Sequence, residues 1–133
     1  MAAEHAAIRS IQRVDLQPLL IAACPSFSSD ETIALPYLLL GEFAYHLLAL
    51  HKRNSTGDFP AVIELIERLH LEGDAYVREA ATIGLLEGIQ NLWMHHRIDP
   101  EEFGRFLLPV SRKAWDSLNA FWDGKISMVG ADP

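Results

Sequence analysis

Two pairs of residues have the types and the spacing of metal ligands. Glu67 and His70 stand three positions apart, and Glu42 and His46 stand four apart, so in a helix the two members of each pair lie on one side. A Glu-x-x-His pair is the ligand unit of di-iron carboxylate bundles, but those sites take a second such pair from another helix, and the sequence has none. Pairs of surface residues have the same spacings. We therefore expect no metal and no cofactor. If the protein were a metal-dependent or small-molecule enzyme with a pocket between helices, these four residues would be its polar set.

Other catalytic signatures are missing from the sequence. It has no Gly-x-Ser-x-Gly, no glycine-rich phosphate loop and no His-Glu-x-x-His. Cys24 is the only cysteine, so the chain has no internal disulfide and no Cys-based zinc site. It ends the apolar run 19–24 with no basic neighbour to lower its pKa, and we expect it to be buried as a small hydrophobe. A non-enzymatic role is favoured over an enzyme.

The segment from Gly73 to Asn91 predicts one long helix with a small-residue edge. Ala80, Gly84 and Gly88 recur every four residues. A glycine inside a helix costs about 1 kcal/mol relative to alanine, so we expect the close approach of a neighbouring helix to compensate for it.

A polar strip beside this edge is the candidate binding surface. The formal net charge is −7, and seven acids stand between Asp58 and Glu87 against two bases. Such a run is either a solvated helix face or a docking surface for a cationic partner. The charge argues against nonspecific binding to nucleic acid or an anionic membrane. The residues expected to contact a protein partner are Glu72, Asp74, Arg78, Glu79, Glu87 and Asn91.

The elements that carry these residues are all predicted to be helices. Apolar residues recur at helical spacing along the chain, and no segment alternates as a strand does. We expect a single compact all-α domain of six or seven helices over residues 1–124, and a flexible tail over residues 125–133. No apolar run reaches the roughly 20 residues of a membrane span, and no signal peptide is present, so a cytoplasmic location is expected. Helices are predicted over residues 2–14, after Asp15, from Pro36 to about Lys52, from Asp58 or Phe59 to Gly73, from Asp74 onward, after Asp99-Pro100, and from Ser111, as a cap, to Gly124.

Residues 59–91 resemble a single HEAT-type repeat. They contain a first helix, a turn ending at Asp74, then Val77-Arg78 and the pair Ala80-Ala81. In that family the Asp and the Arg form polar ladders between stacked repeats, and Asp74 and Arg78 match those positions. Such repeats stack on neighbours, and no second copy is present. The resemblance therefore implies a HEAT-like helical hairpin and not a solenoid.

A longer resemblance spans residues 16–123. It rests on six segments: Cys24-Pro25-Ser26-Phe27, Leu40-Gly41-Glu42-Phe43-Ala44, Glu67-Arg68-Leu69-His70, Tyr76 to Asn91, Leu107-Leu108-Pro109 and Phe121-Trp122. In these segments the chain is similar to an uncharacterised family of small all-helical bacterial proteins. The resemblance implies a fold of that family's type and no assigned activity.

These observations favour a small, acidic, cytoplasmic protein-interaction module. Neutralisation of a basic partner, as by an immunity protein or an antitoxin, would be one instance of that role. Two alternatives stay open: the enzyme with the polar set named above, and a homo-oligomeric structural protein.

Overall fold

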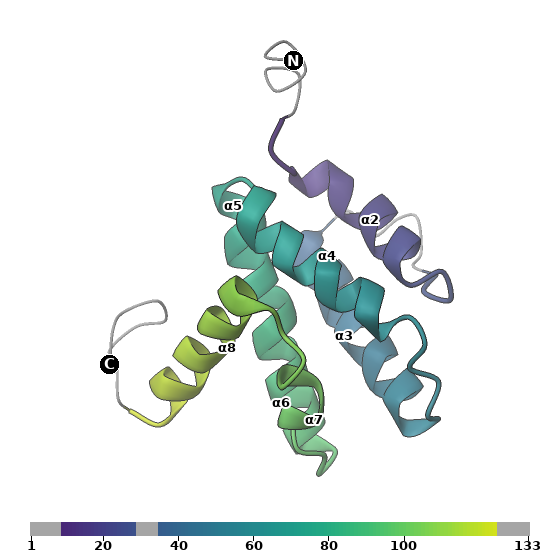
Figure 1. The fold of residues 1–133 in the computed structure, drawn as a ribbon, viewed down its shortest axis with the longest axis vertical. Coiled ribbons are helices and arrows are strands. Elements are labelled where there is room, and N and C mark those ends of the chain that lie inside the picture. Colours follow the sequence, from purple (N-terminus) through teal and green to yellow (C-terminus); the bar gives the residue numbers. More distant parts are fainter. Residues whose placement is uncertain (1–8, 29–34, 125–133) are drawn as a thin grey trace.

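A computed structural model describes residues 9–28 and 35–124 of the chain (Figure 1). The flexible tail expected at residues 125–133, and residues 2–8 of the expected first helix, lie outside these ranges. The described part contains six helices when α5, η2 and α6, which follow one another without a break, are counted as one. This confirms the predicted all-α class. The elements are η1 (Arg13–Asp15), α2 (Leu16–Ala23), α3 (Pro36–Lys52), α4 (Phe59–Glu72), α5 (Ala75–Glu79), η2 (Ala80–Leu86), α6 (Glu87–His95), α7 (Glu101–Gly104) and α8 (Pro109–Trp122).

Proline and aspartate set most of the helix starts. Pro36, Pro60 and Pro109 each occupy the first turn of a helix, where a missing N–H costs nothing because that donor has no partner within the helix. Gly73 ends α4, and the Asp74 carboxylate then accepts a hydrogen bond of 2.8 Å from the Val77 N–H to begin α5. The starts predicted at Pro36, at Asp58 or Phe59 and at Asp74 are confirmed.

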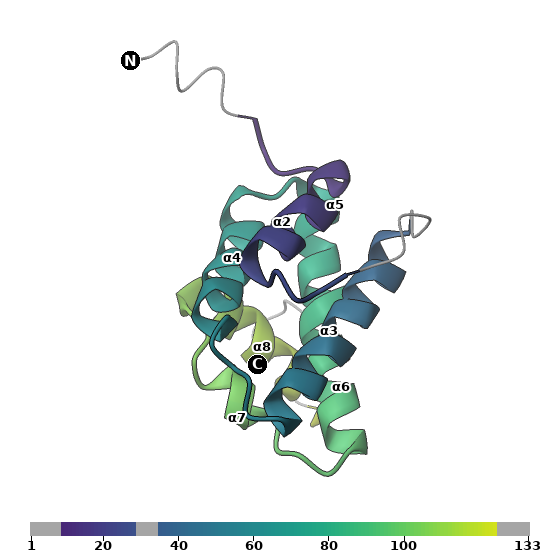
Figure 2. The ribbon, with the colours of Figure 1, turned by 90° about the vertical axis from the view of Figure 1, so that its right-hand side faces the viewer.

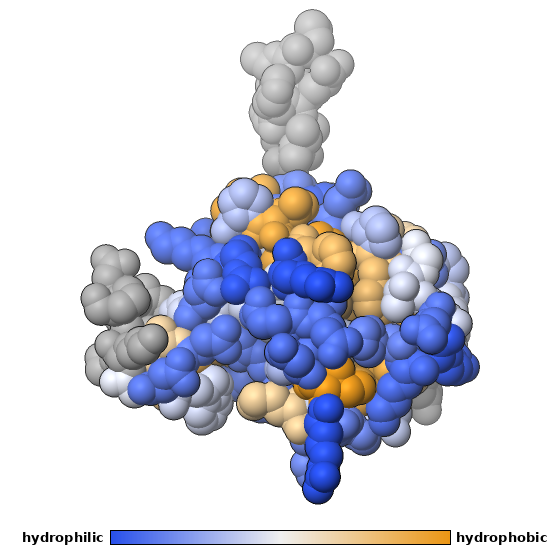
Figure 3. All heavy atoms as spheres, turned by 60° about the horizontal axis from the view of Figure 1, so that its bottom comes forward, coloured by the Kyte–Doolittle hydropathy of each residue, from blue (hydrophilic) through white to orange (hydrophobic). Residues whose placement is uncertain are grey.

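The long helix α5–η2–α6 is the element on which the others pack. α3 runs along one side of it, α4 contacts both α8 and α2, and α8 contacts η2 (Figures 1 and 2). Most large apolar side chains lie between these layers. Over the lower end of the molecule the surface is mostly hydrophilic, with small separate apolar patches (Figure 3). No helix in the described ranges is both long and apolar enough to cross a membrane.

The small-residue edge packs against α3, as predicted. A Cβ atom added at Gly84 would lie 3.1 Å from Tyr37 Cδ1 and 3.2 Å from Leu40 Cδ1. The helix itself differs from the uniform α-helix that the spacing predicts, because residues 80–86 are π-helical. The Glu87 N–H donates to the Thr82 carbonyl, five residues back, which adds one residue to that turn and changes which side chains lie above one another.

The helix predicted over residues 2–14 is wrong over residues 9–12, which are extended. The Ile11 N–H donates to the Glu72 carbonyl at 2.8 Å, and the Asp74 N–H donates to the Ile11 carbonyl at 2.9 Å. The last carbonyls of a helix have no partner within it, so the Glu72 carbonyl at the end of α4 is free to accept from the Ile11 N–H, and the two segments form an isolated β-bridge. Burial of the Ile11 side chain adds to the same contact.

A contact between an indole and a glycine fixes α7 against α8. Gly104 and Trp115 are both buried, and the indole lies so close to Gly104 that an added Cβ would overlap it. The Trp115 Nε1–H donates to the Glu101 carboxylate at 2.6 Å, which holds the ring in this position. The four-residue helix α7 is therefore held by tertiary contacts, because it is too short to be stable alone.

The substitution Gly104→Ala should lower the free energy of unfolding by about 1–3 kcal/mol, because the new methyl group displaces the Trp115 indole or α7 itself. Urea unfolding followed by tryptophan fluorescence measures the change. Gly57→Ala is the matched control, because its Cβ would meet no atom within 4 Å. Equal stability of the two variants would contradict the proposed contact.

Candidate functional site

Glu67 is a buried residue whose carboxylate caps the start of α8. Its Oε1 accepts hydrogen bonds from the Ser111 N–H (2.8 Å) and the Ser111 hydroxyl (2.7 Å), and its Oε2 accepts one from the Val110 N–H (2.9 Å). These N–H groups start α8 and have no partner within that helix. A carboxylate is also favoured at this positive end of a helix dipole. The prediction that Ser111 caps α8 is therefore wrong, because Glu67 from α4 fills that role.

The hydrogen bonds decide the protonation state of Glu67. Burial alone would raise its pKa, but the backbone N–H groups of Ser111 and Val110 and the Ser111 hydroxyl together hold the pKa below its usual value. Each of these donors favours the charged form. Glu67 is therefore an ionised carboxylate at neutral pH, and both of its oxygens accept hydrogen bonds.

His70 is engaged in the core beside it. Its Nδ1 lies 2.8 Å from the Ile66 carbonyl, so Nδ1 carries the proton and donates. Nε2 then accepts the hydroxyl proton of Thr82 on η2, at 2.9 Å. Burial lowers the pKa of His70 and favours the neutral ring. The pair Glu67 and His70 thus ties α4 to α8 and η2, and both ring nitrogens of the histidine are occupied.

Glu42 and His46 lie on α3, apart from that pair. His46 Nε2 is 2.8 Å from the Ser26 hydroxyl, and burial, followed by the charge of Arg53, lowers the pKa of His46. Glu42 is exposed. The four residues therefore do not form the single polar set that a metal-dependent enzyme would need. Glu67 and His70 lie against α8 and η2, whereas Glu42 and His46 lie on α3. Within the described ranges, no three His, Cys, Asp or Glu side chains converge as metal ligands.

The first three acids of the predicted strip all have partners inside the protein. Glu72 pairs with Arg68 one turn earlier at 3.2 Å, and Asp74 caps α5. The Glu79 carboxylate accepts a hydrogen bond of 3.3 Å from the Tyr37 hydroxyl on α3. Each of these three carboxylates therefore has a structural role within the protein.

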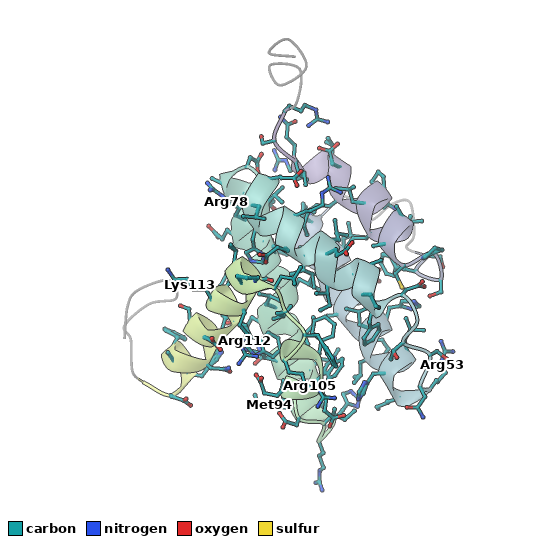
Figure 4. The ribbon with its side chains drawn as sticks, viewed as in Figure 1. Arg53, Arg78, Met94, Arg105, Arg112 and Lys113 are labelled. Carbon is teal, nitrogen blue, oxygen red and sulfur yellow. The ribbon has the colours of Figure 1, made fainter. Side chains whose placement is uncertain are left out.

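The other three residues of the strip are unpaired. Arg78, Glu87 and Asn91 make no side-chain hydrogen bond or ion pair with the described residues. Arg78 projects from α5 at the edge of the molecule (Figure 4), whereas Asn91 lines a hollow between α3 and α6. That these six residues contact a partner stays a prediction, and they do not form one continuous strip of free charge.

Two shallow hollows flank α3 and meet at Gly41. One, of about 440 Å³, lies between α3 and α6, which run side by side (Figure 2). The other, of about 620 Å³, follows the outer side of α3. We call their surface the α3–α6 face. Its residues are Tyr37, Leu38, Gly41, Glu42, Ala44, Tyr45, His46 and Ala49 on α3, Gly88, Asn91, Leu92 and His95 on α6, and Phe27 and Ser28 before α3.

This face combines exposed apolar side chains with carboxylates. Leu38 is 54% exposed and Tyr45 is 58% exposed, seven positions apart and therefore on one side of α3. Glu42 lies between them, and Glu79 reaches the face through Tyr37. None of the described residues that line the two hollows is Lys or Arg.

The strip predicted from the sequence missed the contribution of α3. The sequence of α3 does contain a signal for this surface: the helix has apolar residues beyond the stripe of Leu39, Phe43 and Leu47 that enters the core. A helix that is apolar beyond the stripe it buries has a second surface to cover.

Comparison with known proteins identifies the family. Residues 18–123 match a family described as Domain of unknown function (DUF7674). The chain belongs to this family. The match runs from α2 to the end of α8, so the DUF7674 domain includes the α3–α6 face and the Glu67 cap, and the predicted resemblance to an uncharacterised all-helical family is confirmed. No curated protein and no solved structure matches the chain.

Glu67→Ala should lower the free energy of unfolding at pH 7 by about 2–4 kcal/mol, because it leaves the donors at the start of α8 without an acceptor. Glu67→Gln should lower it less, because one oxygen remains. Glu64→Gln, at an exposed position of the same helix, should have little effect.

The Glu67 pKa in the folded protein lies below the unfolded value, so its charged form stabilises the fold above about pH 5, and this contribution is lost as the pH falls toward the folded pKa. Urea unfolding at pH 7 and at about pH 3.5 should therefore show a larger loss for the wild type than for Glu67→Gln. An equal loss in the two proteins would rule out this role for the carboxylate.

Proposed function

We propose that this domain is a small cytoplasmic, non-enzymatic protein-interaction module that binds a basic partner protein through the α3–α6 face. The observation that carries the proposal is the exposure of Leu38 and Tyr45 on one side of α3, with the carboxylate of Glu42 between them. The acidic composition favours one such role, in which the domain neutralises the activity of its basic partner.

The apolar side chains would supply most of the binding free energy. Aromatic and large aliphatic residues at the centre of an interface contribute most when a partner excludes water from them. Tyr37 and Tyr76 stack edge to face with ring centroids 6.0 Å apart, next to Leu38. The rings would therefore meet a partner in a fixed orientation, which reduces the entropy lost on binding.

The charges would select the partner. Glu42 lies between the exposed apolar residues, and the Glu79 carboxylate is hydrogen-bonded to Tyr37 of the face. The described residues that line the hollows include no Lys or Arg. A surface with basic groups around an apolar centre is the complement of this arrangement. The same charges would disfavour nucleic acid and anionic membranes, both of which are negatively charged.

We also propose that the hairpin of α4 and α5–η2–α6 is HEAT-like in its packing. Asp74 starts the second helix of the hairpin, and small residues lie where α3 approaches it. Arg78, which in the repeat family pairs with an Asp of a neighbouring repeat, has no partner among the described residues. This arrangement supports a single unit that presents a helix face and not a stacked solenoid.

Purification of the tagged protein from its own cells, in parallel with three variants, tests the proposal. The double variant Leu38→Ala/Tyr45→Ala should lose a basic partner that the wild type retains at low salt, with affinity reduced by about 30-fold or more. Gly88→Ala should raise the free energy of unfolding by up to about 1 kcal/mol, because its Cβ would lie 3.7 Å from the Ala44 Cβ without a clash. It should nevertheless weaken binding, because the methyl group fills the hollow between α3 and α6.

Leu71→Ala is the control, because Leu71 is also exposed but lies outside the face. It should bind as the wild type does, and thermal unfolding confirms that every variant is folded. Binding that survives the double variant, or a partner that is acidic, would refute the proposal. Light scattering that shows a dimer disrupted by the double variant would instead assign the face to self-association.

A further inference from the structure

A third hollow, of about 580 Å³, lies where the end of α3, the start of α4 and α7 meet. α7 lies beside the α3–α4 connection in Figure 2. The hollow shares no lining residue with the α3–α6 face. Its volume falls in the range of about 300–1,000 Å³ that is typical of small-molecule sites. It is therefore a separate candidate for binding, of a size suited to a compact ligand.

The walls of the hollow are aromatic and held in place by the core. Phe59 from α4 stacks edge to face with Phe103 from α7 at 5.7 Å, and Phe103 stacks in turn with the buried Trp93, also at 5.7 Å. Ile63 completes this side. Because Phe103 and Trp93 are buried, the walls are preformed and a ligand would not have to order them.

The rim carries an apolar side chain that water now contacts. Phe106 is 58% exposed, although it follows directly on α7 and lines the hollow. The guanidinium of Arg105 lies 4.9 Å from the centroid of its ring. The face of this phenyl ring thus already attracts a cation, as expected from the negative charge of a π face. Figure 4 shows Arg105 at this end of the molecule, next to α7.

Carboxylates reach the hollow from two sides. Glu64 comes from α4 and Glu102 from α7, and the Glu102 carboxylate accepts a hydrogen bond from His51 Nε2 at 2.9 Å. Against these two acids stands one guanidinium, that of Arg105. The local charge is therefore negative, like that of the whole chain. An anionic ligand would meet repulsion here, and a cationic one would be attracted.

We propose that this hollow binds a small organic ammonium compound, one with a cationic amine on an aromatic or branched apolar body. The apolar body would lie against Phe59, Ile63 and Phe103, where it displaces water. The ammonium group would lie between Glu64 and Glu102, where both carboxylates attract it. This site is independent of the partner-binding face, so either proposal can fail alone.

Titration of the ¹⁵N-labelled protein with three probes of similar size tests the proposal by NMR. Phenethylamine is the cation, 2-phenylethanol is the neutral analogue and 3-phenylpropanoate is the anion. Phenethylamine should shift the backbone amides of Ile63, Phe103 and Phe106 in a saturable way in the millimolar range. The alcohol should bind about five to ten times more weakly, and the anion more weakly still.

The double variant Glu64→Gln/Glu102→Gln should reduce the affinity for phenethylamine about fivefold to tenfold and leave that for the alcohol unchanged. Both positions are exposed, so the fold should be retained. Glu87→Gln, outside the hollow, is the matched control and should bind phenethylamine as the wild type does. Amide shifts that map elsewhere, the absence of saturable shifts with phenethylamine, or equal affinity for the amine and the anion would overturn the proposal.

Discussion

The position of α8 depends on the carboxylate of Glu67, and several other contacts depend on α8. The start of a helix has N–H groups that need acceptors, and this start lies against α4, where Ser111 is buried. A single ionised side chain accepts from two of these N–H groups and from the Ser111 hydroxyl. An ionised group is stable in that place only because its desolvation is offset by three hydrogen bonds and the helix dipole.

The consequences of that cap extend along α8 to α7. Once α8 is placed, Trp115 can cover Gly104 and donate its N–H to Glu101. Arg112 bonds to the same carboxylate at 2.7 Å and to the Gly104 carbonyl at 3.0 Å. These contacts hold a four-residue helix that would not form alone. Because α7 supplies the aromatic wall and part of the rim of the lower hollow, the shape of that hollow depends on an acid about 40 residues earlier in the chain.

The long helix α5–η2–α6 packs against three neighbours, α3, α4 and α8, and its π-helical middle contacts all three. Gly84 allows the close approach of α3 on one side, while on another the Thr82 hydroxyl donates a hydrogen bond to Nε2 of the neutral His70 of α4. Further along, the Gln90 amide donates to the Trp115 carbonyl at 3.3 Å and to Asn119 at 3.2 Å on α8. An additional residue in the turn changes the angle between the part that faces α4 and the part that faces α8. We infer no separate activity from the π turn, because these packing contacts account for it.

The sequence predicted what local chemistry determines and missed what distant contacts determine. Helix starts at Pro36, Asp58-Pro60 and Asp74 follow from caps and first-turn prolines, and the packing at Gly84 follows from the cost of glycine in a helix. The role of Glu67 could not be predicted, because its partners stand more than 40 positions away and its spacing from His70 is common to metal sites and ordinary helix pairs. The extended segment at Ile11 was missed for a similar reason: a β-bridge to Gly73 outweighed a weak helical pattern.

The number of acids in the sequence predicts a binding surface poorly, because many of these acids are paired within the protein. Of the seven acids between residues 58 and 87, four have partners within the protein: Glu67, Glu72, Asp74 and Glu79. The other three, Asp58, Glu64 and Glu87, make no side-chain hydrogen bond or ion pair with the described residues. Glu64 lines the lower hollow, and Glu87 stands one turn before Asn91, which lines the α3–α6 face. A carboxylate that is already paired gains little from a new cation, since its charge is partly neutralised, whereas an unpaired one keeps its full attraction. Exposed apolar side chains beside an unpaired carboxylate, Glu64 at the lower hollow and Glu42 on the α3–α6 face, therefore locate both candidate sites better than the net charge does.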